Sequence, residues 1–221
     1  MSTTGSPLDR DTSAPRGQAA RGGAGQGAAP EVPLVVVLIG LPGAGKSTVA
    51  AALEARLGLR RVCRDAIRRA MFPKCDYSFV EKRAAFRTVL LAVEINGLLG
   101  HSSVVDGMTF SRREDYEQVL ALAGAMDFDV LPLFVDCPPA LARERIARDL
   151  LERAHPAEDR EPDLVDAVAR RFDPPPVAAI RIDASRSMEE VCRLAVAEVA
   201  ARLRRPSPRV GFDSRSMPRA L

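Results

Sequence analysis

The sequence lacks the features of a membrane, secreted or metal-scaffolded protein. No apolar stretch approaches the 18 residues of a membrane span, and the N-terminus has no charged start followed by an apolar segment. The four cysteines, Cys63, Cys75, Cys137 and Cys192, have no paired spacing, so we expect neither a disulfide framework nor a zinc site. These absences predict a soluble, cytoplasmic protein with reduced thiols and no membrane partner.

Lysine is scarce as well. Of 32 basic residues only Lys46, Lys74 and Lys82 are lysine, so a lysine at position 46 suggests a need for a compact ammonium group. The net charge of +3 comes from the C-terminal residues 201–221, which carry six arginines against one aspartate. The core is slightly negative, so its charge does not indicate nucleic acid as a partner, although nucleic acid stays open.

Both ends of the chain are predicted to be disordered tails around one folded domain. Residues 1–32 are rich in Gly, Ala, Ser, Pro and Arg without apolar periodicity, so burial cannot offset the entropy of ordering them. Residues 204–221 have the same character and are basic. The chain of 221 residues, 47% of them hydrophobic, is long enough for one core, which we place in residues 33–203.

Strand-like runs alternate with helical patterns inside this domain. The strands are expected at residues 34–39, 60–63, 102–107, 128–136 and 178–183. The helices are expected at residues 46–57, 65–72, 77–99, 112–125, 139–153, 163–171 and 188–203, with Ser111 and Ser187 at helix starts and Gly58, Gly100 and Asp127 at helix ends. The alternation predicts a three-layer α/β fold, a five-stranded parallel sheet with helices on both faces.

Residues 40–47, GLPGAGKS, match the phosphate-binding pattern G-x-x-x-x-G-K-[ST] between a predicted strand and a predicted helix. Glycines let several backbone N–H groups converge on phosphate oxygens, and the helix N-terminus adds its positive end. Lys46 would reach the β- and γ-phosphates and Ser47 would bind Mg²⁺. The expected ATP contacts are Gly40, Pro42, Gly43, Ala44, Gly45, Lys46, Ser47 and Thr48. The alternatives are a tight turn without ligand and the pattern G-x-G-x-x-G, which fails at Thr48.

Two acids follow predicted strands. Asp65 comes after residues 60–63, with Arg68 one helical turn later, and Asp106 lies in the run 102–107. Open parallel sheets bind ligands at the carboxyl ends of their strands, where one acid can support Mg²⁺ and another can accept a proton from an attacking hydroxyl. The alternatives are a helix N-cap for Asp65, a strand-end acid for Asp106 and a solvated helix face for Arg68. A solvated, salt-bridged helix face is the favoured explanation for Arg60, Arg61 and Arg69.

The segment after the fourth predicted strand contains Arg145 and Arg148 on one short helix before a polar, Pro-containing stretch. A mobile segment that brings arginine over transferring phosphate would act as a lid, whereas the alternative is a helix that is merely soluble. Ser185, after the last strand, is expected beside the adenine. The aromatic residues Tyr77, Phe79 and Phe86 are expected to pack in the core and not to stack on substrate.

The motifs GLPGAGKST, RDAIR, VVDGMTFSRRED, FVDCPPALARERIARD and IDASRSMEEV occur in an order that resembles the P-loop kinases grouped as AAA-type ATPases, from about Leu34 to Arg202. That group includes phage-type polynucleotide 5′-hydroxyl kinases and zeta-toxin-like kinases. The resemblance implies that Asp65 is the general base, that Arg68 binds the acceptor and that Asp106 is the acid after the third strand. It also implies that Arg145 and Arg148 are lid arginines. The family's usual D-x-T-N reads DGMT here.

The motifs favour a Mg²⁺·ATP-dependent kinase that phosphorylates a hydroxyl of a small molecule or of a nucleic-acid end. Its catalytic residues would be Lys46, Asp65, Arg68, Asp106, Arg145 and Arg148, and its metal site Ser47 with Asp106. Arginines around Asp65 indicate an anionic acceptor, whose identity, like the oligomeric state, stays open. The alternative is an ATP-dependent switch or slow ATPase without a phosphoacceptor, which signals through a partner.

Overall fold

The computed structural model describes residues 32–151 and 162–204 of the chain. The predicted tails, residues 1–32 and 204–221, lie outside these ranges except for residues 32 and 204. Strands and helices alternate along the described ranges. They are β1 (Leu34–Ile39), α1 (Lys46–Leu57), β2 (Arg60–Cys63), α2 (Arg64–Met71), α3 (Phe79–Leu98), β3 (Ser103–Asp106), α4 (Arg113–Met126), β4 (Asp129–Asp136), α5 (Pro139–Leu151), α6 (Asp163–Ala169), β5 (Ile180–Asp183) and α7 (Met188–Leu203).

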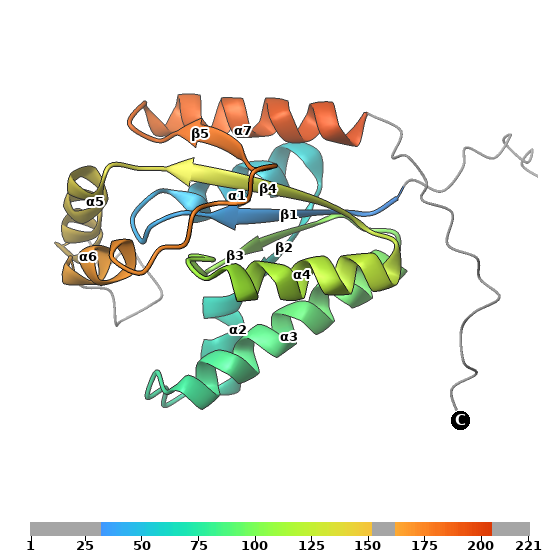
Figure 1. The fold of residues 1–221 in the computed structure, drawn as a ribbon, viewed down its shortest axis with the longest axis horizontal. Coiled ribbons are helices and arrows are strands. Elements are labelled where there is room, and N and C mark those ends of the chain that lie inside the picture. The colour runs from blue at the N-terminus through green and yellow to red at the C-terminus, as the bar shows by residue number, and fades with distance from the viewer. Residues whose placement is uncertain (1–31, 152–161, 205–221) are drawn as a thin grey trace, which may run out of the picture. The chain divides into compact units, whose positions relative to one another are not determined.

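The strands form one parallel sheet in the order β2-β3-β1-β4-β5. This confirms the predicted five-stranded parallel sheet with helices on both faces (Figure 1). β1 lies at the centre, and all six of its residues are buried. Because β1 is covered on both faces, its sequence LVVVLI is a continuous apolar run and not an alternating one.

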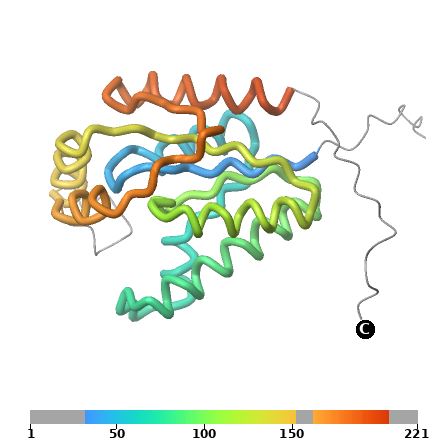
Figure 2. The backbone as a smooth tube through the Cα atoms, in the orientation of Figure 1, coloured from blue at the N-terminus to red at the C-terminus, as the bar shows by residue number. Residues whose placement is uncertain are grey.

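The side chains of β1 divide between two apolar clusters, because successive residues of a strand point to opposite faces. Val36 and Leu38 pack with buried residues of α1 and α7, whereas Val37 and Ile39 pack with those of α3 and α4. The sheet is therefore the middle of three layers, as the tube drawing also shows (Figure 2). Helices α5 and α6 lie beyond the carboxyl ends of β1 and β4 (Figure 1). The motif GLPGAGKS, residues 40–47, follows β1 at the same edge of the sheet.

The boundaries of the elements agree with the predictions to within about two residues. Gly58 and Asp127 end α1 and α4 in the left-handed conformation, and the side chain of Ser187 caps α7 by accepting a hydrogen bond from the backbone N–H of Glu190. In the described part of the chain, no helix combines the length and the apolar character needed to span a bilayer.

The predicted helix start at Ser111 was wrong. α4 begins at Arg113, and its cap comes from a distant segment, because Oδ2 of Asp173 accepts the backbone N–H of Arg113 at 2.8 Å. The backbone N–H of Asp173 donates in turn to the carbonyl of Ser111 at 2.9 Å. The segment that follows α6 is thus fastened to the start of α4, a contact that no local pattern around Ser111 could reveal.

Candidate active site

The turn between β1 and α1 adopts the conformation expected of a phosphate-binding loop. Gly43 and Gly45 have φ angles of 77° and 94°, which side-chain-bearing residues rarely adopt. A Cβ on Gly43 would come within 2.3 Å of the carbonyl oxygen of Ala142 in α5, and one on Gly45 within 2.8 Å of the sulfur of Met188 in α7. The glycines therefore serve both the shape of the loop and its close packing against two helices.

The two polar residues that open α1 are both held in place. Nζ of the buried Lys46 donates to the carbonyls of Gly40 at 2.8 Å and Leu41 at 2.7 Å, so the ammonium lies along the inside of the loop. The hydroxyl of Ser47 donates to Oδ1 of Asp106 at 3.2 Å. Because β3 is the neighbour of β1 in the sheet, the carboxyl end of β3 delivers Asp106 to the start of α1.

Arg61 holds the other oxygen of Asp106. Its Nη2 lies 2.5 Å and its Nε 3.1 Å from Oδ2 of Asp106, which is itself only 1% exposed. β2 pairs with β3, which places this arginine beside the acid. Sequence analysis favoured a solvated, salt-bridged helix face for Arg61, whereas the residue lies on the strand β2 and its salt bridge is with the buried Asp106. The residue is a partner of the predicted metal-site acid.

Asp65 lies at the start of α2 with two arginine partners. Its Oδ1 is 3.3 Å from Nη2 of Arg68 and 3.7 Å from Nη2 of Arg64. The side chain of Arg68 is buried, and its guanidinium lies 4.3 Å from the centre of the Tyr77 ring, a favourable cation–π distance. The structure therefore brings together the predicted pair Asp65 and Arg68. It also shows that the guanidinium of Arg68 packs on the face of the Tyr77 ring.

A loop contact explains why Tyr77 stays in this position. Tyr77 has a φ of 57°, an uncommon conformation for a residue other than glycine. The carboxylate of Glu81 in α3 accepts the backbone N–H groups of Asp76 at 3.1 Å and Tyr77 at 2.9 Å, and the thiol of Cys75 at 2.9 Å. The first turn of α3 thus anchors the connection from α2.

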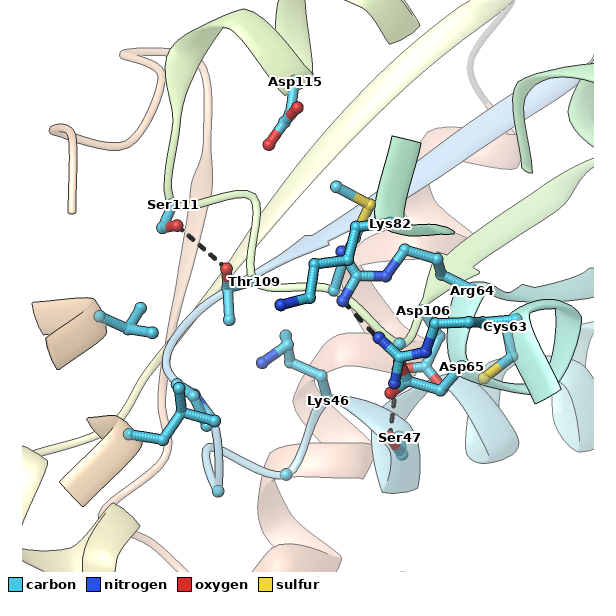
Figure 3. A pocket seen from close by; sticks show the side chains of 18 of the residues that line it. Lys46, Ser47, Cys63, Arg64, Asp65, Lys82, Asp106, Thr109, Ser111 and Asp115 are labelled. Atoms are coloured by element: carbon cyan, nitrogen blue, oxygen red, sulfur yellow. Dashed lines mark hydrogen bonds and ion pairs between the residues drawn. The ribbon is translucent and has the colours of Figure 1, made fainter. Parts of the chain in front are cut away.

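The phosphate-binding loop, Arg61, Asp65, Arg68 and Asp106 line one cavity of about 1230 Å³, part of which is drawn in Figure 3. The predicted residues that line it are Pro42, Gly43, Gly45, Lys46, Ser47, Thr48, Asp65, Arg68, Asp106, Arg145 and Arg148. Three others, Gly40, Ala44 and Ser185, are not among its lining residues. The described lining is strongly cationic, with ten lysines and arginines against five acids. Such a lining concentrates anionic ligands in the cavity.

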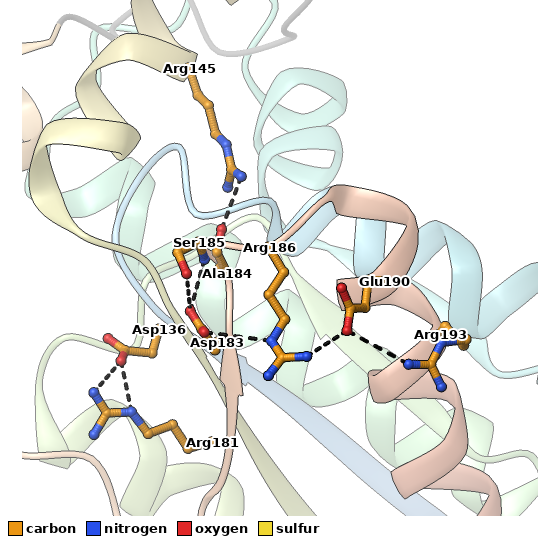
Figure 4. A network of polar contacts seen from close by, with 9 residues as sticks. All are labelled: Asp136, Arg145, Arg181, Asp183, Ala184, Ser185, Arg186, Glu190 and Arg193. Atoms are coloured by element: carbon orange, nitrogen blue, oxygen red, sulfur yellow. Dashed lines mark hydrogen bonds and ion pairs between the residues drawn. The ribbon is translucent and has the colours of Figure 1, made fainter.

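Arg145 of α5 contacts both the phosphate-binding loop and the loop between β5 and α7, and Figure 4 shows the second of these contacts. Its guanidinium donates to the carbonyls of Ala184, between β5 and α7, at 3.0 Å and of Ala44 in the loop at 3.5 Å. Arg148, one turn later on α5, is exposed and lines the cavity. Ser185 is also exposed, and its hydroxyl donates to Oδ1 of Asp183 at 2.6 Å.

The aromatic residues near the start of α3 do not behave alike. Phe86 is buried in the core, as predicted. Phe79 is 77% exposed and lines the cavity, so the prediction that it packs in the core was wrong. An apolar residue at the exposed start of a helix cannot be separated from core residues by composition alone.

Sequence reasoning also missed Asp115. This acid lies in the first turn of α4, lines the cavity, and points its carboxylate into it (Figure 3). Burial raises the pKa of Asp115, and the positive charges of Arg64, Arg83 and Arg112 oppose that rise. The sequence signal was the run RRED at residues 112–115, in the segment that follows the third strand, and this run is equally typical of an ordinary acidic helix start.

The residues present suit a magnesium ion with bound nucleotide. Magnesium prefers oxygen ligands and is usually held by one or two protein side chains together with phosphates and water. The hydroxyl of Ser47 and the carboxylate of Asp106 are hydrogen-bonded neighbours that both line the cavity beside the loop. They are the residues that would hold the ion.

The fold and the loop define the class of the protein, a P-loop NTPase with a kinase-like α/β sheet. The family model described as AAA domain, AAA_33, matches residues 35–175, and the chain belongs to this family. A comparison with curated protein sequences finds no match.

Several solved structures share the fold. The APS kinase CysC of Mycobacterium tuberculosis, in complex with AMPPNP and APS, aligns with a TM-score of 0.59 and 19% identity over 77% of this chain and 99% of its own. A gluconokinase from Sinorhizobium meliloti 1021 aligns with a TM-score of 0.56 and 19% identity over 78% of this chain and 95% of its own. A sugar kinase from Janibacter sp. HTCC2649 aligns with a TM-score of 0.57 and 17% identity over 78% of this chain and 98% of its own. At these identities the similarity establishes the fold.

Proposed function

We propose that the chain is a kinase that transfers the γ-phosphoryl group of Mg²⁺·ATP to a hydroxyl of a small anionic acceptor. The observation that carries the proposal is that one cavity contains both the phosphate-binding loop and the ion pair of Asp65 with Arg68. A switch or slow ATPase needs the loop, but it has no use for an acid and a buried arginine on the facing wall. The kinases that share the fold add support.

The nucleotide side of the cavity holds ATP through the backbone of the loop and through Lys46, which turns from the loop carbonyls toward the β- and γ-phosphates. Ser47 and Asp106 hold Mg²⁺, which neutralises charge on the phosphate oxygens when it is bound. Arg148 lies over the transferring group as a lid residue. Ser185 lies near the adenine, since Arg145 links the loop that contains Ser185 to the phosphate-binding loop.

The acceptor side supplies the base. Asp65 accepts the proton of the attacking hydroxyl, and Arg68 orients the acceptor through its remaining N–H groups. The cations of this side line the cavity, and we take its acceptor to be a small anion and not a nucleic-acid end. We place the activity in residues 33–203.

The test is a search for phosphorylated products with a matched pair of lysine variants. Protein, Mg²⁺ and ATP are incubated with the small-molecule fraction of a cell extract, and new phosphorylated compounds are identified by mass spectrometry. Lys46→Ala lowers the rate of product formation about 10²- to 10³-fold, because it removes a charge aimed at the transferring group. Lys74→Ala, at an exposed position outside the cavity lining, retains the wild-type rate.

The alternative function gives a different result in the same assay. A switch or slow ATPase releases ADP and inorganic phosphate in a Lys46-dependent reaction, and no compound of the extract gains a phosphoryl group. That outcome overturns the kinase proposal.

A further inference from the structure

The mechanism proposed above assigns roles to two of the five acids that line the cavity, and Asp115 is one of the three that it leaves without a role. Asp115 enters from α4, on a different wall from Asp65 and Asp106 (Figure 3). Its side chain is half-buried, and within the described residues it makes no hydrogen bond or ion pair. A carboxylate that is partly shielded from water in a cavity and has no hydrogen-bonding partner from the protein can accept a hydrogen bond from a ligand, so it is a candidate for a ligand contact.

Hydrogen-bonded capping of α4 does not account for the position of Asp115. The backbone N–H of Arg113, at the start of the helix, is already capped by Asp173 at 2.8 Å. The carboxylate of Asp115 accepts no backbone N–H, whereas the other first-turn acid, Glu114, is exposed and can favour the helix dipole from solvent. The carboxylate is thus free of the contacts by which an acid stabilises the end of a helix.

The groups around Asp115 restrict what it can bind. The charges that act on it are the cations Arg64, Arg83 and Arg112 and the neighbouring acid Glu114. An ammonium ligand would be repelled by the three arginines, and an acidic group of the ligand would be repelled by Asp115 but attracted by them. A neutral hydroxyl can donate to the carboxylate with neither penalty.

We propose that Asp115 accepts a hydrogen bond from a hydroxyl of the acceptor while the facing cations, Arg64, Lys82 and Arg83, bind an acidic group of the same molecule. The acceptor is therefore an acidic polyol, a small molecule that carries several hydroxyls and one carboxylate or phosphate. This inference rests on the proposed kinase function and specifies its substrate class.

A nucleic-acid end fits the same wall less well. Nucleic acid requires cations along the path of the strand and aromatic surfaces for successive bases, whereas Glu114 and Asp115 place two acids at the start of α4. In the described lining, Phe79 is the aromatic side chain with high exposure, enough for a single base.

The experiment measures binding by calorimetry to protein saturated with Mg²⁺ and ADP, so that it does not depend on turnover. The probes are D-gluconate and D-glucose 6-phosphate as acidic polyols, sorbitol as a polyol without an acid, and hexanoate as an acid without hydroxyls. A pentathymidylate represents a nucleic-acid end. We expect one of the two acidic polyols to bind at least about 10-fold more tightly than sorbitol and hexanoate, and the preferred one identifies the acid group.

Variants then assign the hydroxyl contact to Asp115. Asp115→Asn weakens binding of the preferred acidic polyol about 10- to 100-fold and leaves hexanoate binding unchanged, because only the polyol donates to the carboxylate. Glu117→Gln, an equal change of charge at an exposed position of α4 outside the cavity lining, leaves both affinities unchanged. An Asp115→Asn protein that melts at or above the wild-type temperature shows that the variant is folded.

Three outcomes overturn the inference. These are acidic polyols that bind no better than sorbitol and hexanoate, affinities that do not change in Asp115→Asn, and tightest binding of pentathymidylate with a loss in Phe79→Ala. The proposed phosphoryl transfer survives each of them if Lys46-dependent phosphorylated products form, although the third outcome would replace the small acceptor by a nucleic-acid end. Conversely, Asp115-dependent binding of an acidic polyol without any such product contradicts the kinase proposal and leaves a binding site.

Discussion

Asp65 and Asp106 both lie at carboxyl ends of neighbouring strands, yet the structure treats them differently. Asp106 is 1% exposed, and both of its carboxylate oxygens accept hydrogen bonds. Oδ1 accepts one from the hydroxyl of Ser47, and Oδ2 accepts two from Nε and Nη2 of Arg61. Asp65 is more open, and its ion pairs with Arg68 and Arg64 are long, at 3.3 and 3.7 Å.

The difference supports the two roles that the proposed function gives to these acids, metal binding for Asp106 and proton acceptance for Asp65. An acid fixed through both oxygens cannot reorient, which suits a constant position beside a metal ion and the P-loop. An acid with loose partners can accept a hydrogen bond from a substrate hydroxyl and then its proton. The next three predictions test this assignment, beginning with the largest expected effect.

Replacement of Asp65 by asparagine has the largest effect. Asp65→Asn lowers kcat for phosphoryl transfer about 10²- to 10⁴-fold, because the amide cannot take the proton of the attacking hydroxyl. The affinity for ATP, measured by calorimetry, stays at the wild-type value. Asp127→Asn serves as the control, since Asp127 is exposed and its left-handed conformation suits asparagine. An unchanged kcat would remove Asp65 from the role of base.

Replacement of Arg61 has an intermediate effect, directed at metal use. Arg61→Ala leaves the buried Asp106 with one partner, so the free energy of unfolding falls by about 1–3 kcal/mol and the Mg²⁺ concentration for half-maximal rate rises about 10-fold. Arg61→Lys restores part of both quantities, because lysine keeps the charge without the two-nitrogen contact. Arg60→Ala, at the exposed neighbouring position, is the control. If the Mg²⁺ requirement did not change, Asp106 would not need its arginine.

Replacement of Tyr77 has the smallest effect. Tyr77→Leu removes the ring beneath Arg68 and lowers kcat/KM for the acceptor about 2- to 5-fold, with the KM for ATP unchanged. Tyr77→Phe keeps the ring face and the wild-type value. Equal losses in both variants would show that the hydroxyl of Tyr77 matters and that the ring does not.

Sequence analysis found the parts of the site that can be recognised from short local patterns of residues. The loop GLPGAGKS lies between a strand and a helix, and both its location and its fold follow from local patterns. Asp65 and Asp106 were found because each directly follows or ends a strand of a parallel sheet. The element boundaries followed from apolar periodicity for the same local reason.

The residues that sequence analysis missed depend on contacts between distant segments. Arg61 looks like one of many surface arginines until β2 pairs with β3 and brings it to Asp106. Asp115 has the sequence context of an ordinary acid at a helix start. It lines the cavity because α4 packs beside α3 in the fold. The cap of α4 is Asp173, far along the chain, so the local candidate Ser111 was chosen wrongly.

The scarcity of lysine has a consequence for chemical probes. Two of the three lysines, Lys46 and Lys82, line the cavity, and Lys74 lies outside its lining. Guanidinium groups do not react with mild acylating reagents because they remain protonated, so the many arginines of the chain are inert to them. An electrophile designed for amines therefore meets a surface with few competing side chains, and an affinity label built on a nucleotide or on an acidic sugar is directed almost entirely to this cavity.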